Sequence, residues 1–153
     1  MKHITFGQAF IRLFTLIALS FTLFGFTNNF GLDSYEIYLN NKLILKQAVN
    51  QPLNLRVLKL HKANSDDQLH IKYKHCTIKE GAGTNRNIIL KDEKGNTVKK
   101  WVFADATGSD LSMAIAVKVL LQLEKNNAMH ELSLHYISRE LPKGEMLAMV
   151  RVE

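Results

Sequence analysis

The sequence contains a single cysteine, Cys76, so no disulfide can form within the chain. Much smaller secreted domains often depend on disulfides, but a chain of 153 residues can bury enough apolar surface to fold by its core alone. We therefore expect Cys76 to be a small buried apolar side chain rather than a reactive or intermolecular thiol.

The chain also lacks an apolar run that is long enough to cross a bilayer comfortably. Its charge-free run, Leu13–Phe26, has fourteen residues, whereas a membrane-spanning helix needs about 20. Lys2, His3 and Arg12 precede this run, and a basic start followed by a short apolar stretch is the pattern of a secretory signal peptide.

We expect cleavage near residue 27, which divides the chain into a signal peptide (1–27) and one domain (28–153). The protein would then be periplasmic or extracellular. The alternative is an uncleaved anchor, in which Ala9–Ile11 lengthen the apolar stretch past Arg12. An uncleaved N-terminal segment is the only part of the chain for which the sequence suggests contact with a membrane.

A concentrated basic surface is also missing. The formal net charge is +6, and the 20 Lys and Arg residues are spread along the chain rather than gathered in one stretch. Nucleic-acid-binding domains usually carry a clustered basic patch. We therefore expect no nucleic-acid partner, and the expected partner is an unidentified protein or glycan.

The clearest pattern in the sequence is the alternation of Gln68–Cys76. Leu69, Ile71, Tyr73 and His75 fall on one face of a strand with a period of two, and the residues between them fall on the other. The pattern predicts a half-buried strand with His75 on the core side.

Similar short alternating runs recur along the rest of the chain. They predict strands over Ser34–Leu39, Lys42–Val49, Leu53–Leu60, Asn87–Lys91, Thr97–Phe103, Glu131–Ile137 and Glu145–Val152. In Leu53–Leu60, Leu53, Leu55 and Val57 fall on one side and Leu58 and Leu60 on the other, so we expect a bulge or a change of partner near Val57.

Turn residues separate these runs. Asn40-Asn41 predicts a hairpin, Asp92–Gly95 a type I turn with a left-handed exit residue, and Leu141–Gly144 a turn with proline in its second position. Leu111–Lys125 fits both periods, and we interpret it as a strand to about Ala116 followed by a short helix that ends at Asn126-Asn127.

These elements define the expected fold class as all-β. Eight or nine short strands with at most one short helix predict an antiparallel β-sandwich, with a small barrel as the second choice. No cofactor is expected.

Imidazole and thiolate groups suggest a metal or redox site at His70, His75 and Cys76. The strand period opposes it, because His75 points away from the other two, while His70 and Cys76 lie about 20 Å apart along a strand. A site would need His61, His130 or His135 from another strand. These residues stay candidates, and no metal site is assigned.

No enzyme is expected either. His130–His135 (HELSLH) has one residue too many for the H-E-x-x-H zinc motif, and as a strand it places Glu131, Ser133 and His135 toward solvent. There is no G-x-S-x-G elbow, and nothing selects a Cys76–His135 or Ser133–His130 pair as nucleophile and base.

Two loops and two aromatic residues are further candidates for binding. Gly81–Thr84 suggests a phosphate cradle, but a strand follows instead of a helix, so a mobile connection is favoured. Asp105–Asp110 could bind calcium or cap its own backbone. Trp101 and Phe103 could stack on a carbohydrate or a protein partner if exposed, although core positions are favoured.

Four stretches of the chain resemble those of small uncharacterised exported proteins of Bacteroidota. They are Tyr35–Gln47, Lys91–Thr97, Phe103–Ser109 and Glu140–Ala148. The resemblance implies export and a compact β domain, and it carries no activity or site.

The sequence thus predicts an exported, non-enzymatic interaction or envelope-associated module. The alternatives are a metal-binding or redox protein that uses Cys76 with histidines, and a carbohydrate-binding module that uses Trp101.

Overall fold

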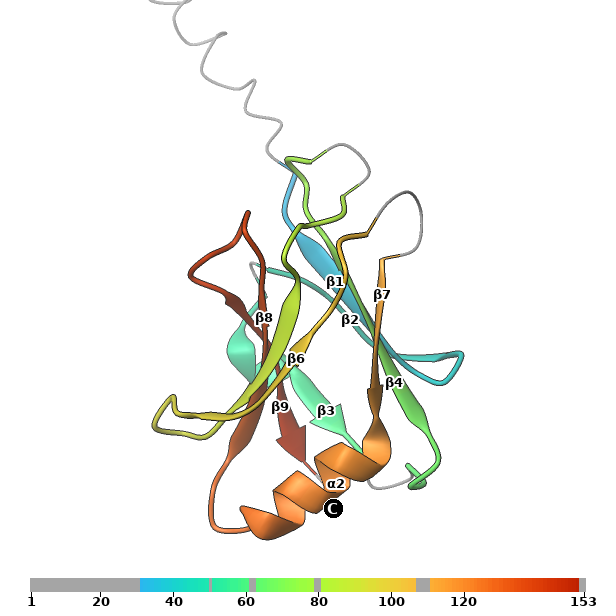
Figure 1. Cartoon of the computed structure of the whole chain (residues 1–153), viewed down its shortest axis with the longest axis vertical. Helices are drawn as coiled ribbons and strands as arrows, with labels where there is room; N and C mark the ends of the chain where they lie inside the picture. The colour runs from blue at the N-terminus through green and yellow to red at the C-terminus, as the bar shows by residue number, and fades with distance from the viewer. Residues whose placement is uncertain (1–30, 50, 61–62, 79–80, 107–110, 152–153) are drawn as a thin grey trace, which may run out of the picture. The chain divides into compact units, whose positions relative to one another are not determined.

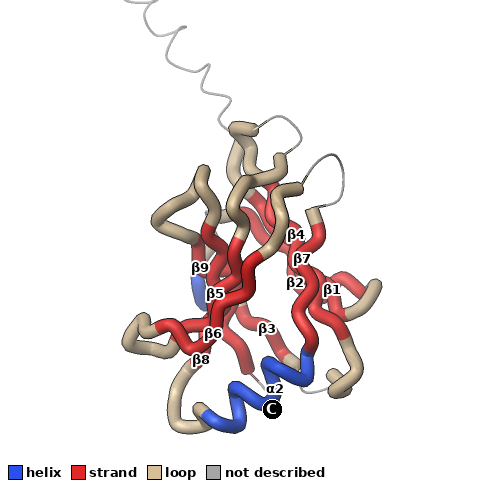
Figure 2. The backbone as a smooth tube through the Cα atoms, in the orientation of Figure 1, coloured by secondary structure: helices blue, strands red, loops and turns tan. Residues whose placement is uncertain are grey.

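The computed structural model describes residues 31–49, 51–60, 63–78, 81–106 and 111–151. Within these residues nine strands form two sheets, accompanied by one α-helix and one 3-10 turn (Figures 1 and 2). The predicted all-β fold with one short helix is therefore confirmed. The two sheets are separate, so the barrel alternative is wrong.

The first sheet, which we call sheet A, has the strand order β2-β1-β4-β7 with every neighbouring pair antiparallel. Its strands are β1 (Ser34–Leu39), β2 (Lys42–Ala48), β4 (Gln68–Lys74) and β7 (Ser112–Ala116).

The second sheet, sheet B, has the order β3-β9-β8-β5-β6. Its strands are β3 (Val57–Lys59), β5 (Asn87–Lys91), β6 (Thr97–Val102), β8 (Leu132–Ile137) and β9 (Glu145–Arg151). Three of its four pairings are antiparallel, and the short edge strand β3 pairs parallel with β9.

The core lies between the two sheets, and most of its strand residues are the alternate ones that the period of two selects. In β4, Leu69, Ile71 and Tyr73 are all buried, and Ile37 of β1 pairs with Ile71. From sheet B, Leu134 and Tyr136 are fully buried against them. The predicted register of β4 is confirmed.

The predicted turns are confirmed as well. Asn40 ends β1 with a φ of 52°, a left-handed conformation that asparagine tolerates, and Gly95 (φ 83°) and Gly144 (φ 72°) occupy the other two turns. The Asp92 carboxylate accepts hydrogen bonds from the backbone N–H groups of Lys94 and Asn96, which fixes the β5–β6 turn.

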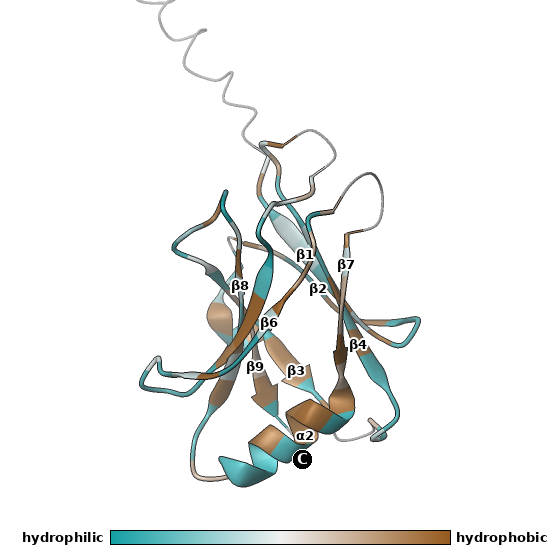
Figure 3. Ribbon diagram, viewed as in Figure 1, coloured by the Kyte–Doolittle hydropathy of each residue, from teal (hydrophilic) through white to brown (hydrophobic). Residues whose placement is uncertain are grey.

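The helix α2 (Val117–Asn126) follows β7 directly, as the sequence indicated. Val117 and Leu120 are buried, and the backbone N–H of Val117 donates to Asp67 O just before β4. Figure 3 shows the apolar start of α2 and its hydrophilic last turn. The Asn127 side chain donates to Leu123 O and ends the helix.

The prediction of one strand over Leu53–Leu60 is wrong in its first half. Leu53–Leu55 forms the 3-10 turn η1 after Pro52, and both leucines are more than half exposed. Strand β3 begins at Val57, and Leu58 and Leu60 are the residues that enter the core. The break occurs because Arg56 turns inward.

The guanidinium of Arg56 is almost completely buried, with 2% of its surface exposed. It donates to the Glu145 carboxylate and to the carbonyl oxygens of Val49, Gln51 and Met146. These acceptors belong to the segment after β2 and to β9, so Arg56 links that segment to β9 next to η1.

Candidate functional site

A buried polar cluster joins the two sheets at the end of the sandwich away from α2. The ring of His75, just after β4, lies with Nδ1 3.1 Å from Asp33 Oδ2 and with Nε2 3.1 Å from the Tyr136 hydroxyl. Tyr73 donates to the same Asp33 oxygen at 3.0 Å, and its ring stacks on that of Tyr136. The prediction that His75 points to the core is confirmed.

Ser138 completes an arrangement in this cluster that resembles a catalytic triad. Its Oγ lies 3.3 Å from His75 Nε2, and Asp33 orients the opposite ring nitrogen. Both Ser138 and His75 are only 3% exposed, and Ser138 Oγ also accepts the Leu141 backbone N–H. A nucleophile must be within reach of its substrate, and the described structure buries this hydroxyl.

Gly83 lies directly above this cluster. A β-carbon there would come within 2.5 Å of the Tyr136 hydroxyl and 2.8 Å of His75 Nε2. The neighbouring Thr84 donates its backbone N–H and its hydroxyl to the Glu140 carboxylate. In the described part of the loop predicted to be mobile, Thr84 is therefore hydrogen-bonded to Glu140 and Gly83 packs against the cluster, which links the two sheets.

The structure does not bring the sequence candidates for metal binding together. Strand β4 ends at Lys74, and Cys76 is exposed rather than buried, so the expectation for that side chain is wrong. Cys76 falls on the face opposite His75, as the period of two indicates, and its backbone N–H donates to the Asp33 carboxylate at 2.8 Å. His70 lies on sheet A with its Nδ1 3.1 Å from Ser112 Oγ.

Among the described residues, no group of three or more His, Cys, Asp or Glu side chains could hold a metal ion. The Asp33 carboxylate also raises the pKa of the Cys76 thiol above its usual range, which makes the thiolate scarcer and the residue less reactive. His61 lies outside the described residues.

Trp101 and Phe103 are half-buried against the core. Trp101 pairs across the strands with Ile88, which is fully buried, so the indole is on the core side of edge strand β6. The Asp105–Asp110 loop is described only in part, since residues 107–110 lie outside the described ranges. Asp105 accepts the Asn85 backbone N–H, as a capping carboxylate does.

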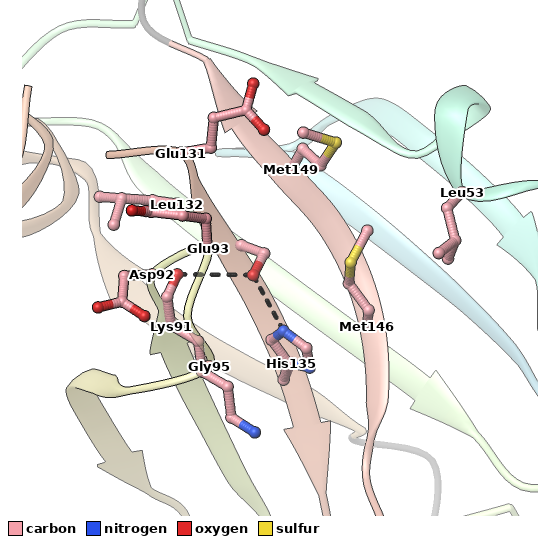
Figure 4. Close-up of a pocket in the computed structure, with 11 residues that line it drawn as sticks. Leu53, Lys91, Asp92, Glu93, Gly95, Glu131, Leu132, His135, Met146 and Met149 are labelled. Atoms are coloured by element: carbon pink, nitrogen blue, oxygen red, sulfur yellow. Dashed lines mark hydrogen bonds between the residues drawn. The ribbon is translucent and has the colours of Figure 1, made fainter. Parts of the chain in front are cut away.

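A hollow of about 440 Å³ opens on the outer face of sheet B (Figure 4). We call it the outer-face pocket. It is formed by η1, β8, β9 and the β5–β6 turn, and its side chains include Leu53, Ser133, His135, Met146 and Met149. A polar hollow of about 290 Å³ on sheet A, lined by Tyr38, Asn40, Asn41, His70, Lys72 and Ser112, contrasts with it.

His135 is the central polar group of the pocket. Its Nε2 lies 3.0 Å from Ser133 Oγ, and Ser133 Oγ is 3.5 Å from the Lys91 carbonyl oxygen (Figure 4). Burial and, to a smaller extent, the Lys91 ammonium lower the pKa of His135 to about 4. The imidazole is therefore neutral at pH 7. The expected solvent-facing direction is correct, but the ring is half-covered.

The two methionines reach this face because of a β-bulge. In a regular strand, residues three apart point to opposite faces. Here the pairing shifts between Leu134, which faces Ala148, and His135, which faces Met146. The extra residue in β9 places both Leu147 and Ala148 in the core.

Met146 and Met149 consequently point to the same side, and Figure 4 shows Met146 beside His135 and Met149 farther along β9, near Glu131. Neither methionine could be predicted as a site residue, since nothing in the run Glu145–Val152 marks the position of the bulge. The one available signal was that two methionines occur within four residues of the predicted strand.

Acidic groups dominate the rim of the pocket. Asp92, Glu93 and Glu131 line it together with one cation, Lys91. Glu93 pairs with Nδ1 of His130 at 2.7 Å, and this contact lowers the pKa of Glu93. The rim therefore favours a positively charged ligand or ligand end.

Comparisons of this chain with protein-family models, with curated proteins and with solved structures give no match. Within the described part of the chain, no helix is long and apolar enough to cross a membrane.

Proposed function

We propose that this protein is an exported, non-enzymatic binding module of the cell envelope and that its ligand occupies the outer-face pocket. Export is inferred from Lys2–Phe26, the basic start and apolar stretch that resemble a signal peptide.

The observation that carries the proposal is the composition of the outer-face pocket. The hollow around His70 on sheet A is lined by polar side chains. This pocket instead combines two leucines, two methionines and a neutral histidine inside an acidic rim. An apolar hollow with a few convergent polar groups is the usual form of a ligand site.

The buried cluster supports the non-enzymatic part of the proposal. The residues closest to a catalytic arrangement, Asp33, His75 and Ser138, are packed beneath Gly83 with their hydrogen-bonding capacity used internally. In the outer-face pocket, the Ser133 hydroxyl neighbours His135 on the same strand, and no described residue orients the other nitrogen of that imidazole as a triad acid would.

Two measurements test the proposal. Fractionation of cells that produce the full chain should place it outside the cytoplasm. The ¹⁵N-labelled protein, mixed with an envelope extract from the same cells, should show amide shifts at His135, Met146 and Met149, while Tyr38 and His70 on sheet A stay unchanged. A cytoplasmic protein, or shifts confined to sheet A, would overturn it.

A further inference from the structure

We propose that the outer-face pocket binds copper in its Cu(I) state through the imidazole of His135 and the thioethers of Met146 and Met149. This inference rests on the proposed function, because it names the ligand of the same pocket.

The strand pairing brings the three donor groups together. Met146 is the direct cross-strand partner of His135, and Met149 is the partner of Ser133, two residues before it. Directly opposed residues on one face have β-carbons about 5 Å apart. Each methionine has three rotatable side-chain bonds, so its sulfur can turn toward a metal beside the ring.

The histidine is oriented as a metal ligand should be. The Ser133 hydroxyl is placed to donate to the Lys91 carbonyl and to accept from Nε2–H of His135. With the hydroxyl donating to the Lys91 carbonyl, Nδ1 of His135 carries the lone pair, and no hydrogen bond to Nδ1 is formed by the described residues. Metal-binding histidines characteristically use one nitrogen for the metal and donate from the other.

The donor types select the metal. Thioether sulfur is a soft ligand that favours Cu(I), and imidazole also suits copper, whereas zinc and calcium sites are built from thiolates, several imidazoles or oxygens. One imidazole and two thioethers are all neutral, which suits a monovalent ion. The carboxylates of Glu93 and Glu131 on the rim offset the repulsion from Lys91.

The chain contains its own controls among its five methionines. Met113 is fully buried in the core, and Met129 is 93% exposed without a histidine opposite it in a strand pair. Any general affinity of silver or copper for thioethers would be strongest at Met129.

The test uses the full chain in mild detergent, labelled with ¹³C at the methionine methyl groups. Ag(I), a redox-inert substitute for Cu(I), is titrated in chloride-free buffer and followed by NMR. The methyl signals of Met146 and Met149 should shift and saturate at one ion per chain, while those of Met113 and Met129 stay in place. Competition with a Cu(I) chelator under reducing conditions then measures Cu(I) affinity.

Variants assign the ligands. Met146→Leu and Met149→Leu keep the apolar volume, and each should weaken Ag(I) binding at least about tenfold, because one metal–sulfur bond is lost. Met129→Leu should bind like the wild type. Ser133→Ala should weaken binding less than His135→Phe, since it removes only the group that orients the ring. Circular dichroism checks that each variant is folded.

Shifts that appear first at Met129, or equal binding by the wild type and by Met146→Leu, would overturn the copper site. If Ag(I) does not bind but the envelope extract still shifts the pocket amides, the copper assignment is wrong and the binding module remains. If neither ligand perturbs the pocket, both proposals fail.

Discussion

Nδ1 of His75 lies 3.1 Å from Oδ2 of Asp33, and this contact ties the residue before β1 to the residue after β4. The other ring nitrogen meets Tyr136 and Ser138 of sheet B. A single imidazole therefore fastens both sheets at one end of the sandwich. Since the ring is almost fully buried, each of its nitrogens needs a partner.

Replacing His75 with leucine should lower the free energy of unfolding by about 2 kcal/mol, because Asp33 loses one partner and Tyr136 another inside the protein. Urea unfolding followed by circular dichroism measures this change. His130→Ala is the matched control, since His130 is well exposed, and it should cost less than about 0.5 kcal/mol. Equal losses in both variants would contradict the role of His75.

Arg56→Met should be the more damaging substitution, at about 3–5 kcal/mol, because it leaves the Glu145 carboxylate and several carbonyl oxygens without their donor. Arg56→Lys should restore little, since one ammonium cannot reproduce the planar fork. Thermal unfolding measures both variants. Arg151, an exposed arginine at the end of β9, provides the control in Arg151→Met.

Glu140 should make the free energy of unfolding depend on pH in the acidic range. Burial alone would raise its pKa, but hydrogen bonds from the Thr84 hydroxyl and backbone lower the pKa of this carboxyl to about 2. The Glu140 carboxylate therefore takes up a proton at a lower pH in the folded state than in the unfolded state, where its pKa is near 4.5. The stabilisation is complete above about pH 4.5 and is lost as the pH falls from there toward 2.

Glu140→Gln isolates this contribution. Because the carboxylate is exposed, the variant should lose about 1 kcal/mol or less at pH 7, and the difference from the wild type should shrink as the solution is acidified. Urea unfolding at several pH values measures it. A difference that does not vary with pH would contradict the assignment to the Glu140–Thr84 contact.

Two turn glycines form a matched pair for backbone strain. Both have positive φ, which costs a residue with a β-carbon about 1 kcal/mol or more. At Gly95 a β-carbon would meet nothing within 4 Å, whereas at Gly144 it would come within 2.7 Å of Ile137 Cγ1 and 3.1 Å of Tyr136 O. Gly144→Ala should therefore lower the melting temperature more than Gly95→Ala.

The sequence predicted strands and turns well because both depend on neighbouring residues. The alternation of Leu69, Ile71 and Tyr73 needs only a buried face, and the turn at Asp92–Gly95 needs only local hydrogen bonds. The failure at Leu53–Leu60 had a distant cause: the burial of Arg56 depends on acceptors in β9 that periodicity does not reveal.

The candidate site was harder to predict for the same reason. Its donors come together through a bulge opposite Leu134 and His135, and the face of Met146 is set by that bulge rather than by its place in the run. His75 and Cys76 attracted attention as reactive residue types. Asp33 contacts both, the buried ring of His75 through Nδ1 and the exposed Cys76 through its backbone N–H.

The parallel pairing of β3 with β9 has a consequence for the time course of folding. Val57 meets Met149, so β3 acquires its only sheet neighbour from a strand far along the chain. All strands of sheet A, by contrast, are present once residue 116 has emerged. Contacts between such distant segments slow folding. A chain that folds slowly stays unfolded for longer, and an unfolded chain can pass through a translocation channel on the proposed export route.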